Sequence, residues 1–153
     1  MKSKHPSAAG SSFVFNDITR LFRKRFAQRA QSLALTYEQV RILFHLQHFD
    51  GIRQAGLADM LQMQAIVLSR ALDKLADLKL IQRLPDPTDR RAVRLVLADN
   101  AAPVLDQINV AMAETKEEAN AGLTKAELDA ITNALEKIKR NLAALVNETN
   151  KNE

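Results

Sequence analysis

The sequence predicts a mainly α-helical protein with one small β-hairpin, and three observations lead to this fold class. Apolar residues recur every three or four positions through most of the 153 residues, which is the period of an amphipathic helix. Aromatic residues make up only 5% of the chain, and glycine and proline number four each, which disfavours an all-β fold. Two short strand-like segments, residues 80–84 and 93–97, interrupt the helical pattern and predict the hairpin, and the second alternates with the period of a half-buried strand.

Composition also limits the chemistry and the partners. The chain has no cysteine, which excludes disulfides, zinc–thiolate sites and thiol-based redox sensing. No apolar run approaches the roughly 20 residues that a membrane span needs. No apolar segment follows Lys2 and Lys4, so we expect no secretory leader and a cytoplasmic location.

Positive charge is concentrated in the first two thirds of the chain. Residues 1–50 carry eight Lys or Arg against three Asp or Glu, and residues 51–99 carry eight against six. Residues 100–153 carry six against nine. This distribution is compatible with an anionic partner of the first two thirds.

The N-terminal elements are predicted in order along the chain. Residues 1–11 are small and polar and predict a flexible tail. A helix is expected to begin at Ser11 or Ser12, either of which can cap it. Its apolar row consists of Phe15, Ile18, Phe22 and Phe26.

Three further helices are expected before the hairpin. The pair Thr36 and Gln39 predicts a capping box at the start of a helix that ends near the turn signal Asp50-Gly51. A short helix around Gln54–Leu61 follows, without a Ser or Thr cap. A longer helix from about Gln64 to Leu78 carries an inner row at Leu68, Leu72 and Leu75.

The hairpin is expected to consist of Leu80–Leu84 and Val93–Leu97, joined by the loop Pro85–Ala92. The loop sequence, PDPTDRRA, is charged and rich in turn residues, so it cannot continue either strand. The prediction is therefore a hairpin with a long, charged tip.

Two helices are expected after the hairpin. Asp99 or Asn100 can cap the first, and the capping box of Thr124 and Glu127 begins the second. The last helix carries a heptad-like apolar row: Leu128, Ile131, Leu135, Ile138, Leu142 and Leu145.

That apolar row has two interpretations. It can be buried within one monomer or packed against a second copy of the chain. One hairpin and two short helices are too small to cover three long apolar stripes, which favours a homodimer. We therefore expect residues 12–34 and 100–149 to form a helical dimerisation region, and residues 35–99 to form a separate domain.

The order of elements within residues 35–99 is that of a winged helix-turn-helix, which predicts DNA binding. The longer helix would enter the major groove of DNA. On its outer face, Gln64 and Arg70 can hydrogen-bond base edges, and Ala65 or Ile66 can contact a thymine methyl group. Ser69 and Lys74 suit phosphate contacts.

The charged hairpin tip would flank that helix. Arg90 and Arg91 present permanently charged planar groups suited to phosphate or to a narrow minor groove. A solvated charged loop is the alternative, and the helix pair before the hairpin disfavours it.

The stretch Gly56–Asp99 resembles the core of the MarR family of regulators. The correspondence lies in Leu57-Ala58, Ser69-Arg70, Asp73-Lys74-Leu75, Leu80-Ile81-Gln82-Arg83, Asp86-Pro87-Thr88-Asp89-Arg90-Arg91, Arg94 and Leu97. The continuation LADNAAPVL (Leu97–Leu105) is similar to the SlyA-like branch of that family. Apolar Ile66-Val67, where small polar residues are common in the family, and Lys79, where glycine often ends the helix, depart from the pattern.

The resemblance implies a transcriptional regulator that binds a pseudo-palindromic, double-stranded operator as a homodimer. It implies that Asp89 holds an arginine in place. The expected DNA-binding set is Gln64, Ala65, Ile66, Ser69, Arg70, Lys74, Arg83, Thr88, Asp89, Arg90, Arg91 and Arg94.

The resemblance also implies that a small aromatic ligand binds between the dimerisation helices and the winged helix and releases the DNA. Candidate lining residues are Phe15, Phe22, Tyr37 and Phe44, although aromatic residues at helical spacing are more often core residues.

Other functions find less support in the sequence. His45 and His48 have a spacing that could share a metal, but Asp50 is not an obvious third ligand, so neither a metal nor a cofactor is expected. No catalytic motif is recognisable, and we expect no enzymatic activity. A winged helix that binds protein rather than DNA is the alternative, and Arg90 and Arg91 beside Arg83 and Arg94 argue against it.

Overall fold

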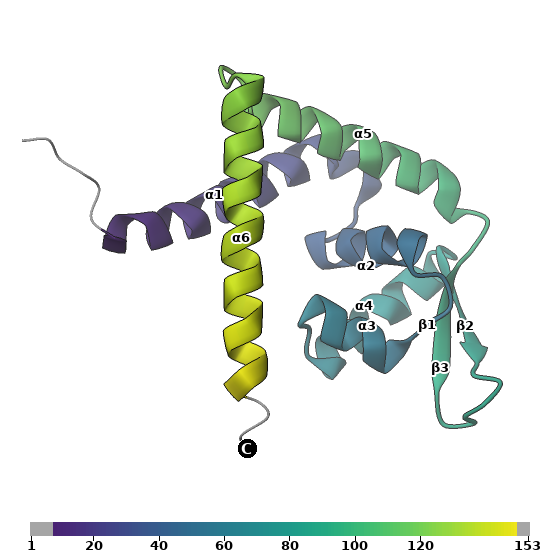
Figure 1. Ribbon diagram of the computed structural model, residues 1–153. Helices are drawn as coiled ribbons and strands as arrows, with labels where there is room; N and C mark the ends of the chain where they lie inside the picture. Colours follow the sequence, from purple (N-terminus) through teal and green to yellow (C-terminus); the bar gives the residue numbers. More distant parts are fainter. Residues whose placement is uncertain (1–7, 150–153) are drawn as a thin grey trace, which may run out of the picture. The chain divides into compact units, whose positions relative to one another are not determined.

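The computed structural model describes residues 8–149, which are helical apart from one small sheet (Figure 1). The chain divides into two compact units after Thr115. Its elements are α1 (Ala8–Arg29), the 3-10 helix η1 (Gln31–Leu33), α2 (Tyr37–His48), β1 (Ile52–Arg53), α3 (Gln54–Leu61), α4 (Ala65–Asp77), β2 (Ile81–Pro85), β3 (Val93–Leu97), α5 (Ala101–Ala119) and α6 (Lys125–Thr149).

The start of α1 differs from the prediction. The helix begins at Ala8, so the expected start at Ser11 or Ser12 was wrong, and residues 8–11 of the predicted flexible tail are helical. The rest of that predicted tail, residues 1–7, lies outside the described residues. Alanine has the highest helix propensity of all residues, which explains why Ala8 and Ala9 extend the helix beyond the serines.

Capping residues fix the starts of two other helices as predicted. The Thr36 hydroxyl accepts the Gln39 backbone N–H at 3.3 Å, and the Gln39 side chain accepts the Thr36 N–H at 2.8 Å. Thr124 and Glu127 make the same reciprocal pair at the start of α6. Both capping boxes are confirmed because they depend only on residues three positions apart.

The sheet has three antiparallel strands in the order β1-β3-β2, so the prediction of a two-stranded hairpin was incomplete. Strands β2 and β3 pair from Ile81 opposite Leu97 to Pro85 opposite Val93, close to the expected segments. Strand β1 has only two residues, too few to show an alternating pattern. Gly51 precedes it with φ +73°, a conformation that glycine adopts without strain.

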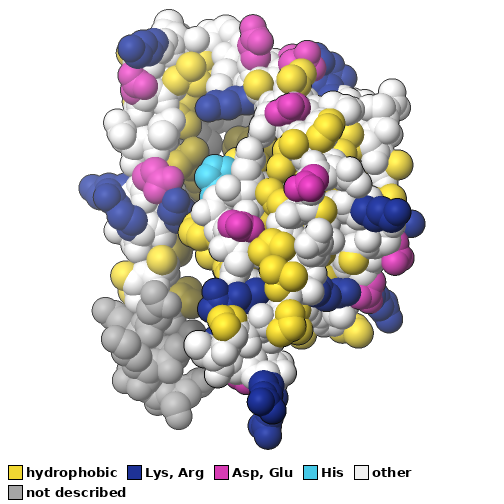
Figure 2. Space-filling model, turned by 90° about the vertical axis from the view of Figure 1, so that its right-hand side faces the viewer, with side chains coloured by type: hydrophobic (Ala, Val, Ile, Leu, Met, Phe, Trp, Pro, Cys, Tyr) yellow, Lys and Arg dark blue, Asp and Glu magenta, His cyan; other side chains and the backbone are white. Residues whose placement is uncertain are grey.

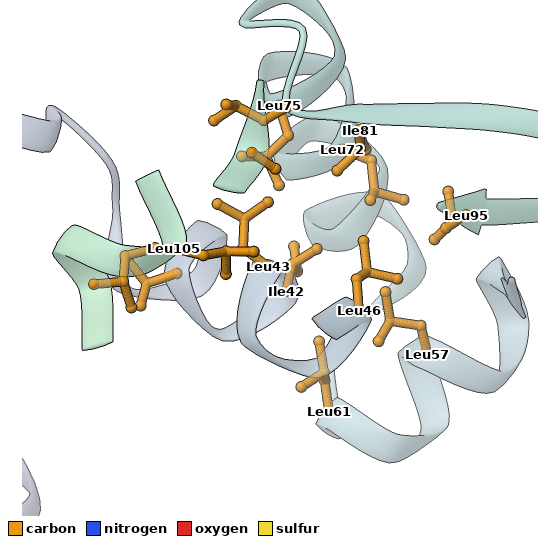
Figure 3. Packing of buried hydrophobic residues seen from close by; sticks show 14 of the residues in the cluster. Ile42, Leu43, Leu46, Leu57, Leu61, Leu72, Leu75, Ile81, Leu95 and Leu105 are labelled. Carbon is orange, nitrogen blue, oxygen red and sulfur yellow. The ribbon is translucent and has the colours of Figure 1, made fainter. Parts of the chain in front are cut away.

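The core of the first unit lies where α2, α3 and α4 meet the sheet (Figures 1 and 3). The predicted row Leu68, Leu72 and Leu75 is fully buried on α4, and Leu57 and Leu61 are buried on α3. In Figure 3, Leu57, Leu61 and Leu72 lie around Ile42, Leu43 and Leu46 of α2, and all of them belong to one buried cluster. This packing holds α3 and α4 rigidly relative to the sheet.

The second unit contains α6, and the predicted apolar row of that helix is largely exposed. Ile131, Leu135, Ile138 and Leu142 are each between 41% and 58% accessible to solvent. Such a row of large apolar side chains on one helix is costly to leave in water. None of the helices among residues 8–149 is both long enough and apolar enough to cross a membrane.

Candidate nucleic-acid interface

Helices α3 and α4 are joined by a tight turn. Gln62 ends α3 in the left-handed conformation with φ 50°, and its side-chain amide donates to the Asp59 carbonyl at 2.8 Å. The Met63 N–H then bonds the Ala58 carbonyl at 3.0 Å, which closes the turn before α4 begins at Ala65. The result is the helix-turn-helix that the sequence predicted.

The two faces of α4 have different surroundings. Leu68, Leu72 and Leu75 pack into the core, and the predicted base-reading and phosphate-binding residues lie on the other side of the helix. All of them are exposed except Ser69, which is half-buried: Gln64, Ala65, Ile66, Ser69, Arg70 and Lys74. Among the described residues Arg70 makes no ion pair, so its guanidinium is available to a ligand.

Helix α4 ends without glycine. Lys79 takes a left-handed φ of 58° at the position where glycine often ends the helix in the family. The Leu80 N–H bonds the Leu75 carbonyl at 2.9 Å, and the Lys79 N–H bonds the Ala76 carbonyl at 2.9 Å. These two bonds form a Schellman motif, which normally favours glycine at the position of Lys79.

The wing, formed by β2, β3 and the loop 86–92, is organised around Asp86. The side chain of Asp86 is fully buried, and its Oδ2 accepts one hydrogen bond each from Arg53 Nε and Arg94 Nε, both at 2.8 Å. Its Oδ1 accepts the Thr88 backbone N–H at 2.8 Å, the Thr88 hydroxyl at 2.7 Å and the Asp89 N–H at 3.1 Å. Asp86 therefore binds the edge strand β1 and the central strand β3 to the loop.

These contacts stabilise the ionised form of the Asp86 carboxylate. Hydrogen bonds from Arg53, and then from Thr88 and Arg94, hold the pKa of Asp86 far below its usual range. The same hydrogen bond, together with the negative charge of Asp86, raises the pKa of Arg53. Asp86 remains an anion at physiological pH, and the wing is held by charge-assisted bonds.

Asp89 shapes the loop tip. The expectation was that Asp89 holds an arginine in place, and its carboxylate accepts the backbone N–H of Arg91 at 2.9 Å. The guanidinium groups of Arg53 and Arg94 are bound by Asp86. The sequence signal for Asp86 was an Asp followed two residues later by a Thr, the pattern of an Asx turn, but its long-range partner Arg53 is 33 positions away.

Arg83 joins the wing to α4. Its Nη2 donates to Asp73 Oδ1 at 2.7 Å, and its side chain is 32% exposed. Arg94, on β3, is likewise held by a carboxylate, that of Asp86, and the Arg94 side chain is 41% exposed. Both of these arginines, which were predicted to contact DNA, thus also position the wing, and the pairing of Arg83 with Asp73 was not predicted.

Arg90 and Arg91 lie at the wing tip, exposed and without an ion pair among the described residues. Figure 2 shows Lys and Arg side chains at the lowest point of the molecule, where Figure 1 places the loop between β2 and β3. A hollow of about 550 Å³ lies between α3, the first turn of α4 and the wing, and Ala65 and Arg91 both line it. The start of α4 and the wing tip therefore belong to one surface.

The four predicted ligand-lining aromatic residues lie on α1 and α2. Phe15 is exposed on α1, and Phe22 is half-buried. The Tyr37 ring packs edge-on against Phe26, and the Phe44 ring lies 5.0 Å from the imidazole of His48. A cavity of about 310 Å³ in the same unit is lined by other residues, from α1, η1 and α5.

His45 and His48 are engaged within α2. Their Nδ1 atoms lie 2.8 Å and 2.9 Å from the carbonyl oxygens of Arg41 and Phe44, one turn earlier. Within the described part of the chain, no group of three or more His, Asp or Glu residues is arranged to hold a metal ion.

Comparison with known proteins shows a similarity to one family and to several solved structures. Residues 35–92 match the MarR family. A SlyA-like transcription regulator from Listeria monocytogenes is 25% identical, with a TM-score of 0.78 over 85% of this chain and 87% of that chain. A MarR transcriptional regulator from Methanosarcina mazei Go1 is also 25% identical, with a TM-score of 0.79 over 88% and 99%.

A MarR mutant from E. coli, crystallised with operator DNA, shares the fold at 22% identity, with a TM-score of 0.76 over 83% of this chain and 91% of that chain. The order of elements, the wing and the family match over residues 35–92 agree, and they confirm the winged-helix fold. Over residues 35–92, the segment from α2 to the wing, the chain is similar to the MarR family.

Proposed function

We propose that this protein is a transcriptional regulator of the MarR family that acts in the cytoplasm as a homodimer and binds a specific, pseudo-palindromic sequence of double-stranded DNA. The observation that carries the proposal is the single surface formed by the start of α4 and the wing tip. It presents Arg70 on a rigid helix, and Arg90 and Arg91 on a loop that Asp86 holds in place. A MarR protein of the same fold has been crystallised with operator DNA.

In this proposal α4 lies in the major groove, whose width admits one helix. Gln64 and Arg70 hydrogen-bond base edges, while Ser69 and Lys74 contact phosphates. Arg90 and Arg91 contact phosphates or enter the neighbouring minor groove. The partly exposed guanidinium groups of Arg83 and Arg94 add positive charge, whereas Thr88 and Asp89 contribute by shaping the loop.

The homodimer is supported by apolar surface that one monomer leaves in water. Ile131, Leu135 and Ile138 on α6 are exposed, as are Phe13 and Ile18 on α1. Packing against the same surfaces of a second copy would bury both rows, as in a symmetric, isologous interface. Residues 12–34 and 100–149 are then the dimerisation region, and two α4 helices read the two halves of the operator.

The proposal includes release from DNA by a small aromatic ligand. Among the candidate residues, Phe44 has a ring that stays 39% exposed, and the imidazoles of His45 and His48 lie next to it. A ligand that binds the folded protein raises its melting temperature. If no member of a panel of aromatic acids raises that temperature or weakens DNA binding, this part of the proposal is wrong.

Selection of bound duplexes from a random-sequence library tests the DNA-binding proposal. We expect enrichment of a two-fold related sequence and at least 1000-fold preference over random duplex at physiological salt. Arg70→Ala should weaken binding to the selected duplex by about tenfold or more and relax its preference at one position per half-site.

Lys24→Ala is the matched control, because Lys24 is exposed on α1, away from the wing in Figure 1. It should leave both affinity and preference unchanged. A library that yields no enriched sequence, combined with binding to a protein partner, would favour the protein-interaction alternative.

A further inference from the structure

The first turn of α4 exposes two large apolar side chains. Ile66 is 58% accessible to solvent and Val67 is 43% accessible, while Leu68, the next residue, is completely buried. Ala65, directly before them, is exposed as well. The first turn of α4, the end that would enter a DNA groove first, is therefore both exposed and apolar.

The fold does not require these residues. Leu68, Leu72 and Leu75 supply the packing of α4 against the core, and all three have no accessible surface. Isoleucine and valine are β-branched, and they have lower helix propensity than Ala, Glu or Lys, which suit an exposed first turn better. A contact outside the monomer explains their presence better than the stability of α4 does.

The neighbours of Ile66 indicate what that contact is. Arg70 lies one helical turn beyond Ile66, and Ser69 lies three positions beyond it, so the three side chains share one face of α4. Lys74 follows one turn after Arg70. The outer face of α4 thus combines an apolar pair at its tip with cationic and polar side chains. This face is complementary to the major groove, where thymine presents its C5-methyl group between anionic backbones.

Resting on the proposed DNA binding, we propose that Ile66 and Val67 recognise thymine through its C5-methyl group. They are thus specificity-determining residues of α4, and they select thymine at defined positions of each operator half-site. Arg70 reads an adjacent base through hydrogen bonds. Specificity in this helix thus comes from an apolar contact and a polar contact placed one turn apart.

Replacement of thymine by deoxyuridine tests the proposal, because it removes only the C5-methyl group. In the duplex selected from the random-sequence library, each thymine pair related by the two-fold axis is replaced in turn, and affinity is measured by fluorescence anisotropy. Burying one methyl-sized group changes affinity by about fourfold, so we expect a loss of roughly fifteen-fold when both half-sites change. Thymines outside the contacted positions should have no effect.

The variants Ile66→Ala and Val67→Ala identify the residue responsible. Each should weaken binding to the thymine duplex, and at least one should bind the thymine and deoxyuridine duplexes equally. Phe49→Ala is the control, because Phe49 is also exposed, at 47%, but follows α2 and lies outside both α4 and the proposed dimerisation region. Circular dichroism should show unchanged helix content, since all three side chains are exposed.

Two results would overturn the proposal. The first is that no deoxyuridine replacement weakens binding of the wild-type protein although it still prefers the selected duplex; DNA binding then stands and methyl recognition fails. The second is that the loss with deoxyuridine is the same in wild type, Ile66→Ala and Val67→Ala. A protein that binds no duplex at all would overturn both this inference and the proposed function.

Discussion

Replacing both Arg90 and Arg91 by alanine tests how the wing binds DNA, because phosphate contacts are measured by their salt dependence. Each phosphate neutralised by an Arg or Lys releases counterions and adds about 0.9 to the slope of log affinity against log salt concentration. Both side chains are exposed at the wing tip and free of ion pairs among the described residues.

With two wings per homodimer, about four contacts are removed, so the slope should become shallower by about 3.6. Between 50 and 200 mM salt, a fourfold change, this difference corresponds to about a 150-fold smaller loss of affinity. If only one arginine of each wing contacts phosphate, the change is about 1.8. The magnitude therefore reports how many wing arginines touch the backbone.

The assay is fluorescence anisotropy with a labelled random duplex at several salt concentrations, so that base recognition does not contribute. A double variant, Lys24→Ala with Lys116→Ala, removes the same two positive charges from exposed positions on α1 and α5 and should leave the slope unchanged. An Arg90 and Arg91 double variant with the wild-type slope would refute the proposed role of the wing.

Three further predictions follow from the structure. Asp86→Asn should weaken DNA binding and leave the helix content unchanged. Because the pKa of Asp86 is depressed in the folded state, its ionised carboxylate also stabilises the fold. This contribution to the free energy of unfolding is complete above the pKa of the unfolded state, near 4, and declines below it. Urea titrations should thus show a wild-type advantage that is constant from about pH 8 to 5 and smaller toward pH 3, and an advantage that grows on acidification would contradict this. Lys79→Gly should stabilise the fold by about 1 kcal/mol in the same assay, because glycine adopts the left-handed φ without strain, whereas Lys79→Ala, which keeps the strain, should not. Ile138→Glu should reduce the mass in light scattering from a dimer to the 17.1 kDa monomer, and Asn133→Glu, off the apolar row of α6, should not; a dimer in both would exclude this row from the interface.

Local sequence was sufficient to predict most helix bounds and the face that α4 buries. The capping boxes at Thr36 and Thr124 each involve residues three positions apart, and the row Leu68, Leu72 and Leu75 follows from the helical period. The same reasoning gave the exposed set on α4, because residues off the buried row must face outward.

Tertiary structure alone decided how the wing is held. Asp86 meets Arg53 because β1 pairs with β3 and places Arg53 opposite Arg94, a register that depends on segments more than 40 positions apart. The two-residue strand β1 has no period of its own, so neither it nor the role of Asp86 could be predicted from the sequence. The residues that suit DNA binding could thus be predicted from the sequence, whereas the ion pairs that hold them in position form only when distant strands pair.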